Sequence, residues 1–465
     1  MISLRFEAGT LVATPPQQSS ESPWSGMTWD QRTSQWRAPA RCYRQLLIDA
    51  RAAGQQWQDD ARDYQILDLA LAEPIIPRSH QTEALRAWKD GGKAGCVALP
   101  TGAGKTITAV LAIVMTGRST LVVVPTIDLM QQWEQVLSKY LRLNSAPCKI
   151  GLLGGGVHDP QPITVATYDS ALIHIERLGA KYGLLIFDEC HHLPAPQYQT
   201  IALAAIAPFR LGLSATMERA DGRESVVYDL VGPLVYEAKI QEMVAKVLAP
   251  YDVFNIQVPM SDEERLAYEM ARATYTSFLR RSGIRFNQGA DWMQFVRIAA
   301  RSADGRQAMR AYREQKRLAQ AASGKLAATW EILARHAGEQ IIIFTDDNAM
   351  AYRIGREFFV PVLTHQTRPK ERKGFLDGFR SGKITILATS RVLNEGVDVP
   401  EASVGVVLSG TGTVREHVQR LGRILRARPG KRAVLYEVIA QGTSEYFVNQ
   451  RRRQHDAYQG STPIS

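Results

Sequence analysis

The fold of this chain is limited above all by an alternation of short, wholly apolar segments with stretches of helical character. Apolar strands without polar alternation must be covered on both faces, and strands separated by helices pair in parallel. The expected strands are Cys96–Leu99, Leu121–Pro125, Ile163–Thr167, Leu184–Asp188 and Leu211–Ser214, followed later by Ile341–Thr345, Ile384–Ala388, Val404–Leu408 and Ala433–Val438. The sequence therefore predicts two α/β domains, each with a parallel sheet between helices.

The first predicted strand runs into a glycine-rich turn and then into a helical stretch, Ile107 to Met115. Glycine lets backbone N–H groups approach phosphate oxygens closely, and a helix N-terminus favours the same negative charge. The strict pattern has glycine at position 99, where this chain has Leu99. The alternative is a glycine-rich turn without a ligand. The pattern predicts a phosphate cradle of Gly102, Ala103 and Gly104, with Lys105 on the β/γ-phosphates of ATP and Thr106 on Mg²⁺.

Two acids stand at the end of the fourth predicted strand, Asp188 as its last residue and Glu189 directly after it. Burial of acids at a strand end is costly unless they face a ligand. Beside the glycine turn, this arrangement favours Asp188 as a Mg²⁺ ligand and Glu189 as the group that orients the attacking water. Zinc at Cys190, His191 and His192 is disfavoured, because adjacent residues cannot all face one ion.

A basic segment, Gln419–Arg426, lies in the second predicted α/β domain. Arg423 and Arg426 are three residues apart, so a helix would present both on one face. Together with Gln419 they are candidates for catalysis, the arginines acting as fingers on the γ-phosphate. The alternative is a basic surface helix.

Weaker signals fit the same scheme, although a plain loop or cap explains each of them as well. They are Arg78 and Gln81 as adenine-binding residues, Ser214 and Thr216 at a strand end, and Glu395, Gly396 and Asp398 as nucleotide-binding residues of the second domain.

Four segments are predicted along the chain: a small α+β domain at 1–75, a first α/β domain at 76–240, a linker strand with a helical insert at 241–337, and a second α/β domain at 338–465. The insert, from Ser261 to Ala337, is expected to be almost continuous helix. Its aromatic stripe of Tyr268, Tyr275 and Phe278 is assigned to helix packing rather than base stacking.

Composition limits the partners. The formal net charge is +10, which favours a polyanion, although a solubility role is equally open. The four cysteines are far apart, which argues against a disulfide framework. Neither a signal core nor an apolar run long enough for a bilayer is present, so a cytoplasmic, nucleoid-associated protein without membrane contact is expected.

Taken in order, these motifs resemble the series of superfamily-two helicases, and most closely the XPB family in its short archaeal and bacterial form. The matching segments are Arg78–Gln81, Leu99–Thr106, Val122–Trp133, Thr164–Ser170, Asp188–His191, Leu211–Thr216, Ile341–Asp346, Leu387–Pro400 and Gln419–Arg426, with Leu4–Thr10, Trp29–Ala40, the helical insert and Ser409–Glu416 characteristic of that short form.

The resemblance implies two RecA-like motor domains, a damage-recognition-like N-terminal domain and a helical thumb that grips DNA. It further implies a 3′→5′ DNA helicase or translocase acting on duplex, forked or single-stranded DNA, in repair. By the same resemblance Thr126, Tyr168 and Thr389 fall in motifs that contact the nucleic-acid backbone. Nucleotide state would be coupled to movement through His191, Ser214, Thr216, Arg219 and Asp221.

One departure leaves alternatives open. The family's Arg-Glu-Asp element reads Arg219-Ala220-Asp221 here, which puts strand opening in doubt but not ATP hydrolysis. The chain could instead be an ATP-gated DNA-binding switch or scaffold for a partner nuclease, with Arg451–Arg453 as a docking tail or a solvated charge run. An RNA helicase would share every motor motif.

Overall fold

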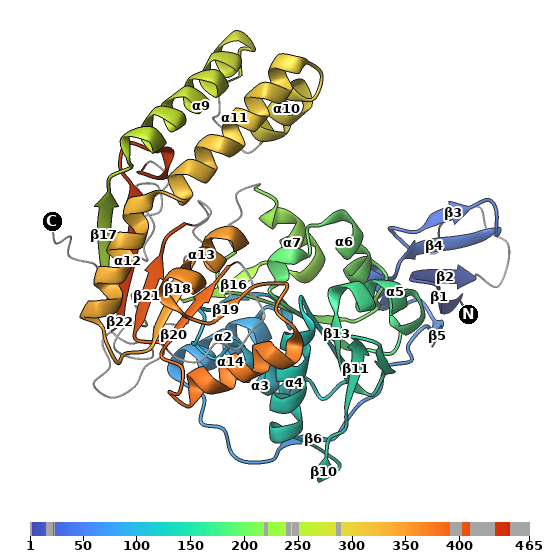
Figure 1. Cartoon of the computed structure of the whole chain (residues 1–465). Helices are drawn as coiled ribbons and strands as arrows, with labels where there is room; N and C mark the ends of the chain where they lie inside the picture. Colours follow the sequence, from blue (N-terminus) through green and yellow to red (C-terminus); the bar gives the residue numbers. More distant parts are fainter. Residues whose placement is uncertain are drawn as a thin grey trace. The chain divides into compact units, whose positions relative to one another are not determined.

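A computed structural model of the chain describes residues 2–14, 22, 24–217, 222–238, 243, 251–284, 290–390, 402–409 and 433–446. The chain divides into two compact units, one built mainly from residues up to 238 and the other mainly from residues beyond it. Among the described residues no helix has the length and apolar character to cross a membrane. Figure 1 shows the elements of each unit.

The N-terminal part of the first unit is a small five-stranded sheet with one helix packed against it. Strand order is β3-β4-β2-β1-β5, antiparallel except for the β1–β5 pair. The elements are β1 (Ile2–Glu7), β2 (Thr10–Thr14), β3 (Thr28–Asp30), β4 (Gln35–Pro39), the 3-10 helix η1 (Ala40–Cys42), α1 (Tyr43–Ala52) and β5 (Trp57–Asp60). Its core continues into the neighbouring α/β domain, because Ala180 and Ile206 of that domain pack in the same cluster.

The rest of the first unit is built around an eight-stranded sheet in the order β12-β11-β13-β8-β14-β15-β7-β16, parallel except at β12. Its strands are β7 (Ala94–Ala98), β8 (Thr120–Val124), β11 (Ile150–Gly154), β12 (Val157–Asp159), β13 (Ile163–Thr167), β14 (Leu184–Asp188), β15 (Phe209–Ser214) and β16 (Leu234–Glu237). The five expected strands are all present at the centre. β11, β12 and β16 were not expected, and β11 carries two glycines, which are depleted in strands.

The helices of this domain connect the strands. They are α2 (Ser79–Asp90), α3 (Lys105–Thr116), α4 (Ile127–Tyr140), α5 (Tyr168–Leu178), the 3-10 helix η2 (Cys190–His192), α6 (Pro196–Leu203) and α7 (Glu224–Val231). A small antiparallel sheet of β6 (Leu69–Leu71), β9 (Leu141–Leu143) and β10 (Ala146–Pro147) joins the segment that leaves the N-terminal domain to the α/β domain.

The second unit has a six-stranded, wholly parallel sheet in the order β17-β22-β21-β18-β20-β19. Its strands are β17 (Tyr251–Val258), β18 (Ile341–Phe344), β19 (Val362–Leu363), β20 (Ile386–Thr389), β21 (Val404–Val407) and β22 (Ala433–Ala440), and the helices α12 (Ser323–Arg335), α13 (Asn348–Phe358) and α14 (Pro369–Arg380) accompany them. The linker strand expected before the insert is β17, which pairs with β22 at the sheet edge. Ala328, Ile332 and Leu333 of α12 belong to the core of this sheet.

The insert is broken into separate helices rather than the almost continuous helix expected. The predicted range contains α9 (Asp262–Arg281), α10 (Ala290–Ala299), α11 (Ala303–Gln320) and α12, and α12 packs on the second sheet. The insert proper is therefore α9 to α11, with α9 and α11 side by side and α10 against α11 (Figure 1). Gly283 has a φ of 64°, which ends α9, and the Ser302 side chain caps α11. The aromatic residues form the small core of the insert, with Tyr275 and Phe278 against Phe295.

Candidate nucleotide-binding site

The residues predicted to bind nucleotide in the first α/β domain gather at the carboxyl-end edge of its sheet. β7 ends at Ala98, and the turn that follows contains two glycines in the left-handed region, Gly102 with φ 86° and Gly104 with φ 89°. Residues with a Cβ avoid this region. Lys105 is the first residue of α3, with Gly104 as its N-cap. The turn therefore has the left-handed backbone positions that the predicted phosphate cradle requires, and phosphate binding itself stays a prediction.

Lys105 is held by one of the two predicted acids. Its Nζ lies 2.9 Å from Oε1 of Glu189, and about one-eighth of each side chain is exposed. Burial by itself would lower the pKa of Lys105, but the charges of Glu189 and Asp188 outweigh it and raise that pKa. The ammonium group is thus firmly charged at the position from which it would meet phosphate.

Asp188 is a buried carboxyl at the end of β14. Its Oδ2 accepts a hydrogen bond from Nε1 of Trp133, 2.8 Å away, and its Oδ1 accepts one from the backbone N–H of Glu189 at 3.0 Å. Burial and the neighbouring Glu189 charge raise its pKa from 3.8 to about 6, against the opposing effect of Lys105. Carboxylate oxygens are ligands that a hard divalent cation prefers, so a buried carboxyl such as Asp188 is compatible with a Mg²⁺ ligand. Thr106, the second residue of α3, stays a predicted ligand.

Glu189 connects the predicted catalytic acids to the strand end of β15. Its backbone φ is 47°, a strained value for a non-glycine residue and one that clusters at functional sites. Its Oε2 lies 3.4 Å from Nδ1 of His191, which in turn lies 3.3 Å from Oγ of Ser214. Ser214 donates from Oγ to the carbonyl of Thr216 at 2.6 Å. A continuous polar path thus runs from Glu189 to the loop after β15.

The buried Gln81 side chain holds two backbone segments together. Its Oε1 accepts from the backbone N–H of Arg78, and its Nε2 donates to the carbonyl of Gly104, 3.2 Å away. A Cβ at Gly104 would come within 2.3 Å of that Nε2. Both ends of the amide therefore bind protein backbone, and adenine recognition by Arg78 and Gln81 stays a prediction.

The three residues assigned to nucleic-acid motifs are engaged in the fold. Oγ1 of Thr126 caps α4 by accepting from the N–H of Leu129, the hydroxyl of buried Tyr168 donates to the carbonyl of Asp188, and Oγ1 of buried Thr389 donates to the carbonyl of Ser390. Contacts of these motifs with nucleic acid therefore stay predictions.

Several predicted residues lie outside the described part of the chain. They are Arg219, Ala220 and Asp221, then Glu395, Gly396 and Asp398, and finally Gln419, Arg423, Arg426 and the Arg451–Arg453 tail. Within the described residues, no three His, Cys, Asp or Glu side chains are grouped to hold a metal ion.

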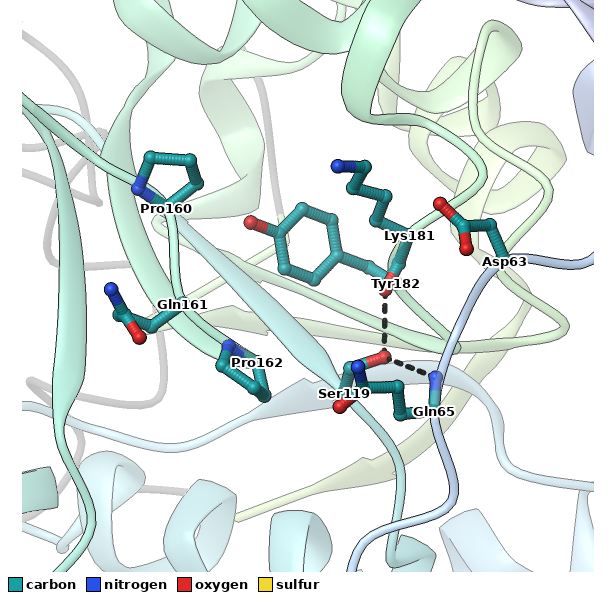
Figure 2. Close-up of a pocket in the computed structure, with 8 residues that line it drawn as sticks. All are labelled: Asp63, Gln65, Ser119, Pro160, Gln161, Pro162, Lys181 and Tyr182. Carbon is teal, nitrogen blue, oxygen red and sulfur yellow. Dashed lines mark hydrogen bonds between the residues drawn. The ribbon is translucent and has the colours of Figure 1, made fainter.

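A separate pocket of about 230 Å³ lies at the opposite edge of the first sheet, before β8, β13 and β14 begin. Figure 2 shows Asp63 and Lys181 on one side of it and the segment Pro160–Pro162 on the other. Ser119 accepts from the backbone N–H of Gln65 and donates to the carbonyl of Lys181, which ties the segment leaving the N-terminal domain to this edge (Figure 2). The pocket is therefore remote from Lys105 along the strands.

Comparison with known proteins is consistent with this geometry. Residues 4–61 match the damage recognition domain of the xeroderma pigmentosum group B helicase, residues 74–219 match the res subunit of type III restriction enzymes, and residues 324–428 match the helicase conserved C-terminal domain. The DNA 3′-5′ translocase XPB2 of Sulfurisphaera tokodaii is 38% identical over 436 residues, which cover 88% of this chain and 98% of that protein. The chain belongs to the XPB family of helicases. The DNA 3′-5′ helicase XPB of Mycobacterium tuberculosis is 32% identical, and the match covers 81% of this chain but only 63% of that protein.

Solved helicase structures share the fold of this XPB-family chain. Yeast Dbp5 bound to RNA and ADP BeF3 aligns with a TM-score of 0.58 at 15% identity, covering 83% of this chain and 90% of that one. The Hef helicase domain of Pyrococcus furiosus aligns with a TM-score of 0.52 at 19% identity, covering 81% and 98%. The two α/β domains are therefore RecA-like, as predicted.

Two residues that make buried polar contacts were given no individual role in the sequence analysis, although both lie in segments quoted for the resemblance. Trp133, which binds Asp188, lies in a quoted motif, but nothing in its spacing pointed to the acid 55 residues away. Asp346 follows β18, and its buried carboxylate contacts Lys316 and Gln320 of the insert. An acid at the end of an apolar strand is the same signal that identified Asp188 and Glu189, so it was available at this position too.

Proposed function

We propose that this chain is an ATP-dependent 3′→5′ DNA translocase that acts on duplex or forked DNA and opens it, in DNA repair. Membership of the XPB family supports the helicase and ATPase class. The observation that best supports the proposal is the ion pair of Lys105 with Glu189, next to Asp188. Phosphoryl transfer uses a cation, an acid that orients water and a metal ligand, and these three residues are proposed for those roles in that order.

Each residue of the site has a proposed task. The backbone N–H groups of Gly102, Ala103 and Gly104 would bind the phosphates of ATP, and Lys105 would bridge the β- and γ-phosphates. Thr106 and Asp188 would hold Mg²⁺, which neutralises charge that develops on the phosphates. Glu189 would orient the attacking water once phosphate competes for Lys105.

The second RecA-like domain would complete the reaction. Arg423 and Arg426 are proposed as arginine fingers, with Gln419, Glu395, Gly396 and Asp398 as further nucleotide contacts. An arginine finger raises the rate of phosphoryl transfer about 10³–10⁵-fold. Arg423→Ala should therefore lower ATP turnover at least about 10²-fold with little change in ATP affinity. Equal losses of affinity and rate would contradict a finger role.

The deciding experiment is the ATPase rate measured with no nucleic acid, single-stranded DNA, duplex, forked DNA and RNA. Stimulation by DNA but not by RNA supports the proposal, whereas equal or greater stimulation by RNA contradicts it. A translocation assay on duplex and an unwinding assay on a fork, run beside it, measure mechanical output.

A second candidate is an ATP-gated DNA-binding switch that serves a partner, such as a nuclease. The specific observation in its favour is Ala220, which replaces the carboxylate of the Arg-Glu-Asp element. ATP turnover that responds to DNA, with neither translocation nor unwinding, would favour the switch. Restoration of unwinding by Ala220→Glu would instead assign the defect to that one side chain.

A further inference from the structure

The helical insert carries a large share of the positive charge of the chain. Residues 261–322 contain twelve Lys or Arg and seven Asp or Glu, which is five of the ten net positive charges. Four arginines of α11 are spaced three or four residues apart, at positions 306, 310, 313 and 317. Residues at this spacing lie on one face of a helix.

This arginine row (Arg306, Arg310, Arg313 and Arg317) is exposed along its whole length. The opposite face of α11 packs inward through residues such as Ala308, Gln315 and Ala319. Glu314 binds Arg317, but in the described part of the chain no carboxylate pairs with the other three arginines. The row therefore presents largely uncompensated charge to solvent.

The row is long enough for several phosphates. The first and last arginines of the row are eleven residues apart, and at about 1.5 Å per residue this is a rise of about 16 Å. One strand of a duplex presents a phosphate about every 3.4 Å along the axis, so the row would span roughly five of them. Guanidinium groups bind phosphate in a planar, two-pronged geometry, which makes a nucleic-acid backbone the matching occupant.

The last turns of α11 are fastened to the second RecA-like sheet. Lys316 Nζ and Gln320 Nε2 each lie 3.2 Å from Oδ2 of Asp346, a carboxylate whose side chain is only 3% exposed. The backbone N–H of Asp346 donates to Oγ of Ser409, 2.7 Å away. Asp346 thus connects the insert to the loops that follow β18 and β21.

The loop that follows β18 also contacts the end of β20, the strand paired with β18. Thr345, which precedes Asp346, donates its backbone N–H to the carbonyl of Thr389 at 2.9 Å. Its Oγ1 lies 2.9 Å from the carbonyl of Asp347 and 3.3 Å from that of Thr389. Thr389 ends β20 in the motif assigned to nucleic-acid contact. A displacement of α11 would therefore move this carboxyl-end edge through two buried hydrogen bonds, that of Asp346 to Ser409 and that of Thr345 to Thr389.

The family resemblance already implies that the insert grips DNA. We propose that α11 couples this grip to the ATPase: the arginine row is the part of the insert that binds backbone phosphates, and the last turns of α11 link its position to the carboxyl-end edge of the second RecA-like sheet through Asp346. Asp346 is a positioning residue in this scheme, because it acts through Lys316 and Gln320. The inference rests on the proposed function, since it needs a nucleic-acid track and an ATPase that responds to it.

The arginine row is tested by the salt dependence of duplex binding. Arg310→Gln combined with Arg313→Gln should weaken binding and reduce the slope of log affinity against log salt by about 2, close to one for each phosphate that the protein no longer neutralises. The matched control is Arg335→Gln with Arg356→Gln, two exposed arginines at helix ends near the opposite edge of the second sheet. Equal slope changes in both double variants, or none in the first, would overturn the phosphate-binding part.

The coupling step is tested by Asp346→Asn. It should keep the salt slope and the DNA-free ATPase rate, while the extra turnover at saturating duplex falls between about 2- and 30-fold, the range of a coupling of 0.5–2 kcal/mol. Asp377→Asn, which removes an exposed acid paired with Arg380, is the control and should retain full stimulation. Full stimulation of Asp346→Asn would overturn the coupling role.

Lys316 gives an independent variant on a half-exposed side chain, which keeps the test decisive if Asp346→Asn does not fold. Lys316→Arg should retain the ion pair and stimulation, whereas Lys316→Gln should reproduce the loss. If the unmodified chain itself shows no stimulation by DNA, the proposed function fails. If it is stimulated and these variants behave like it, only the coupling inference fails.

Discussion

The ammonium nitrogen of Lys105 lies 2.9 Å from Oε1 of Glu189, although 84 residues separate the two in sequence. The two groups that would act on the γ-phosphate and on the attacking water therefore neutralise each other. A triphosphate bound in the glycine turn would compete with Glu189 for Lys105. Binding of substrate would in this way release the carboxylate for its part in the reaction.

Glu189→Gln should lower DNA-stimulated ATP turnover at least about 10²-fold, as for loss of a general base, because the amide cannot take up a proton. DNA binding should remain, and Lys105→Ala should give the same pattern with weaker ATP binding. Turnover and DNA affinity, measured on the same preparations, check this. Glu176→Gln, on the exposed face of α5, is the control, and full turnover by Glu189→Gln would refute the site assignment.

The raised pKa of Asp188, about 6, predicts how turnover depends on pH. Only the ionised carboxylate binds Mg²⁺, so ATP turnover should fall as the pH drops through about 6. Higher Mg²⁺ should move this fall to lower pH, because metal and proton compete. An acid limb that ignores Mg²⁺ concentration would assign the titration to another group.

The same carboxyl links stability to pH. Its pKa is higher in the folded chain than the ordinary 3.8, so ionisation disfavours the fold: the penalty is absent below about pH 4 and grows as the pH rises through 6. Mg²⁺ with nucleotide should relieve it. The rise in melting temperature that they produce should therefore be larger at pH 7.5 than at pH 5.5, and an equal rise at both would contradict this account.

Gln81→Ala separates two roles for that side chain. If Gln81 reads adenine, the variant should lose discrimination between ATP and GTP. If it only fastens Gly104 to the start of α2, KM should rise for both nucleotides by the same factor, since loss of the bond loosens the turn. The ratio of kcat/KM for ATP and GTP decides between them, with Gln199→Ala as a control in the same domain.

Ser214→Ala should uncouple turnover from movement by removing the contact between His191 and the loop after β15. DNA-stimulated ATP hydrolysis is expected to stay within a few-fold, while translocation distance per ATP falls. Ser119→Ala, at the opposite edge of the sheet, is the control. Equal losses of hydrolysis and translocation would mean that Ser214 serves the chemistry itself.

The sequence by itself determined the parts that depend on local chemistry. The central strands are apolar on both faces and are separated by helices, so the parallel sheets followed from hydrophobicity and from this alternation. The glycine turn with Lys105 and the acids at the end of β14 were predicted from residue type and position. The breaks in the insert were missed, because Gly283 and Ser302 interrupt a pattern that otherwise continues in helical period.

Only the tertiary structure decided which distant residues meet. The pairing of Lys105 with Glu189, the Trp133 bond to Asp188 and the fastening of α11 to Asp346 each join residues on different elements. Such contacts depend on strand order and on the packing of helices against the sheet. Sequence spacing carries little information about either, since a strand's neighbour in a parallel sheet need not be its neighbour in the chain.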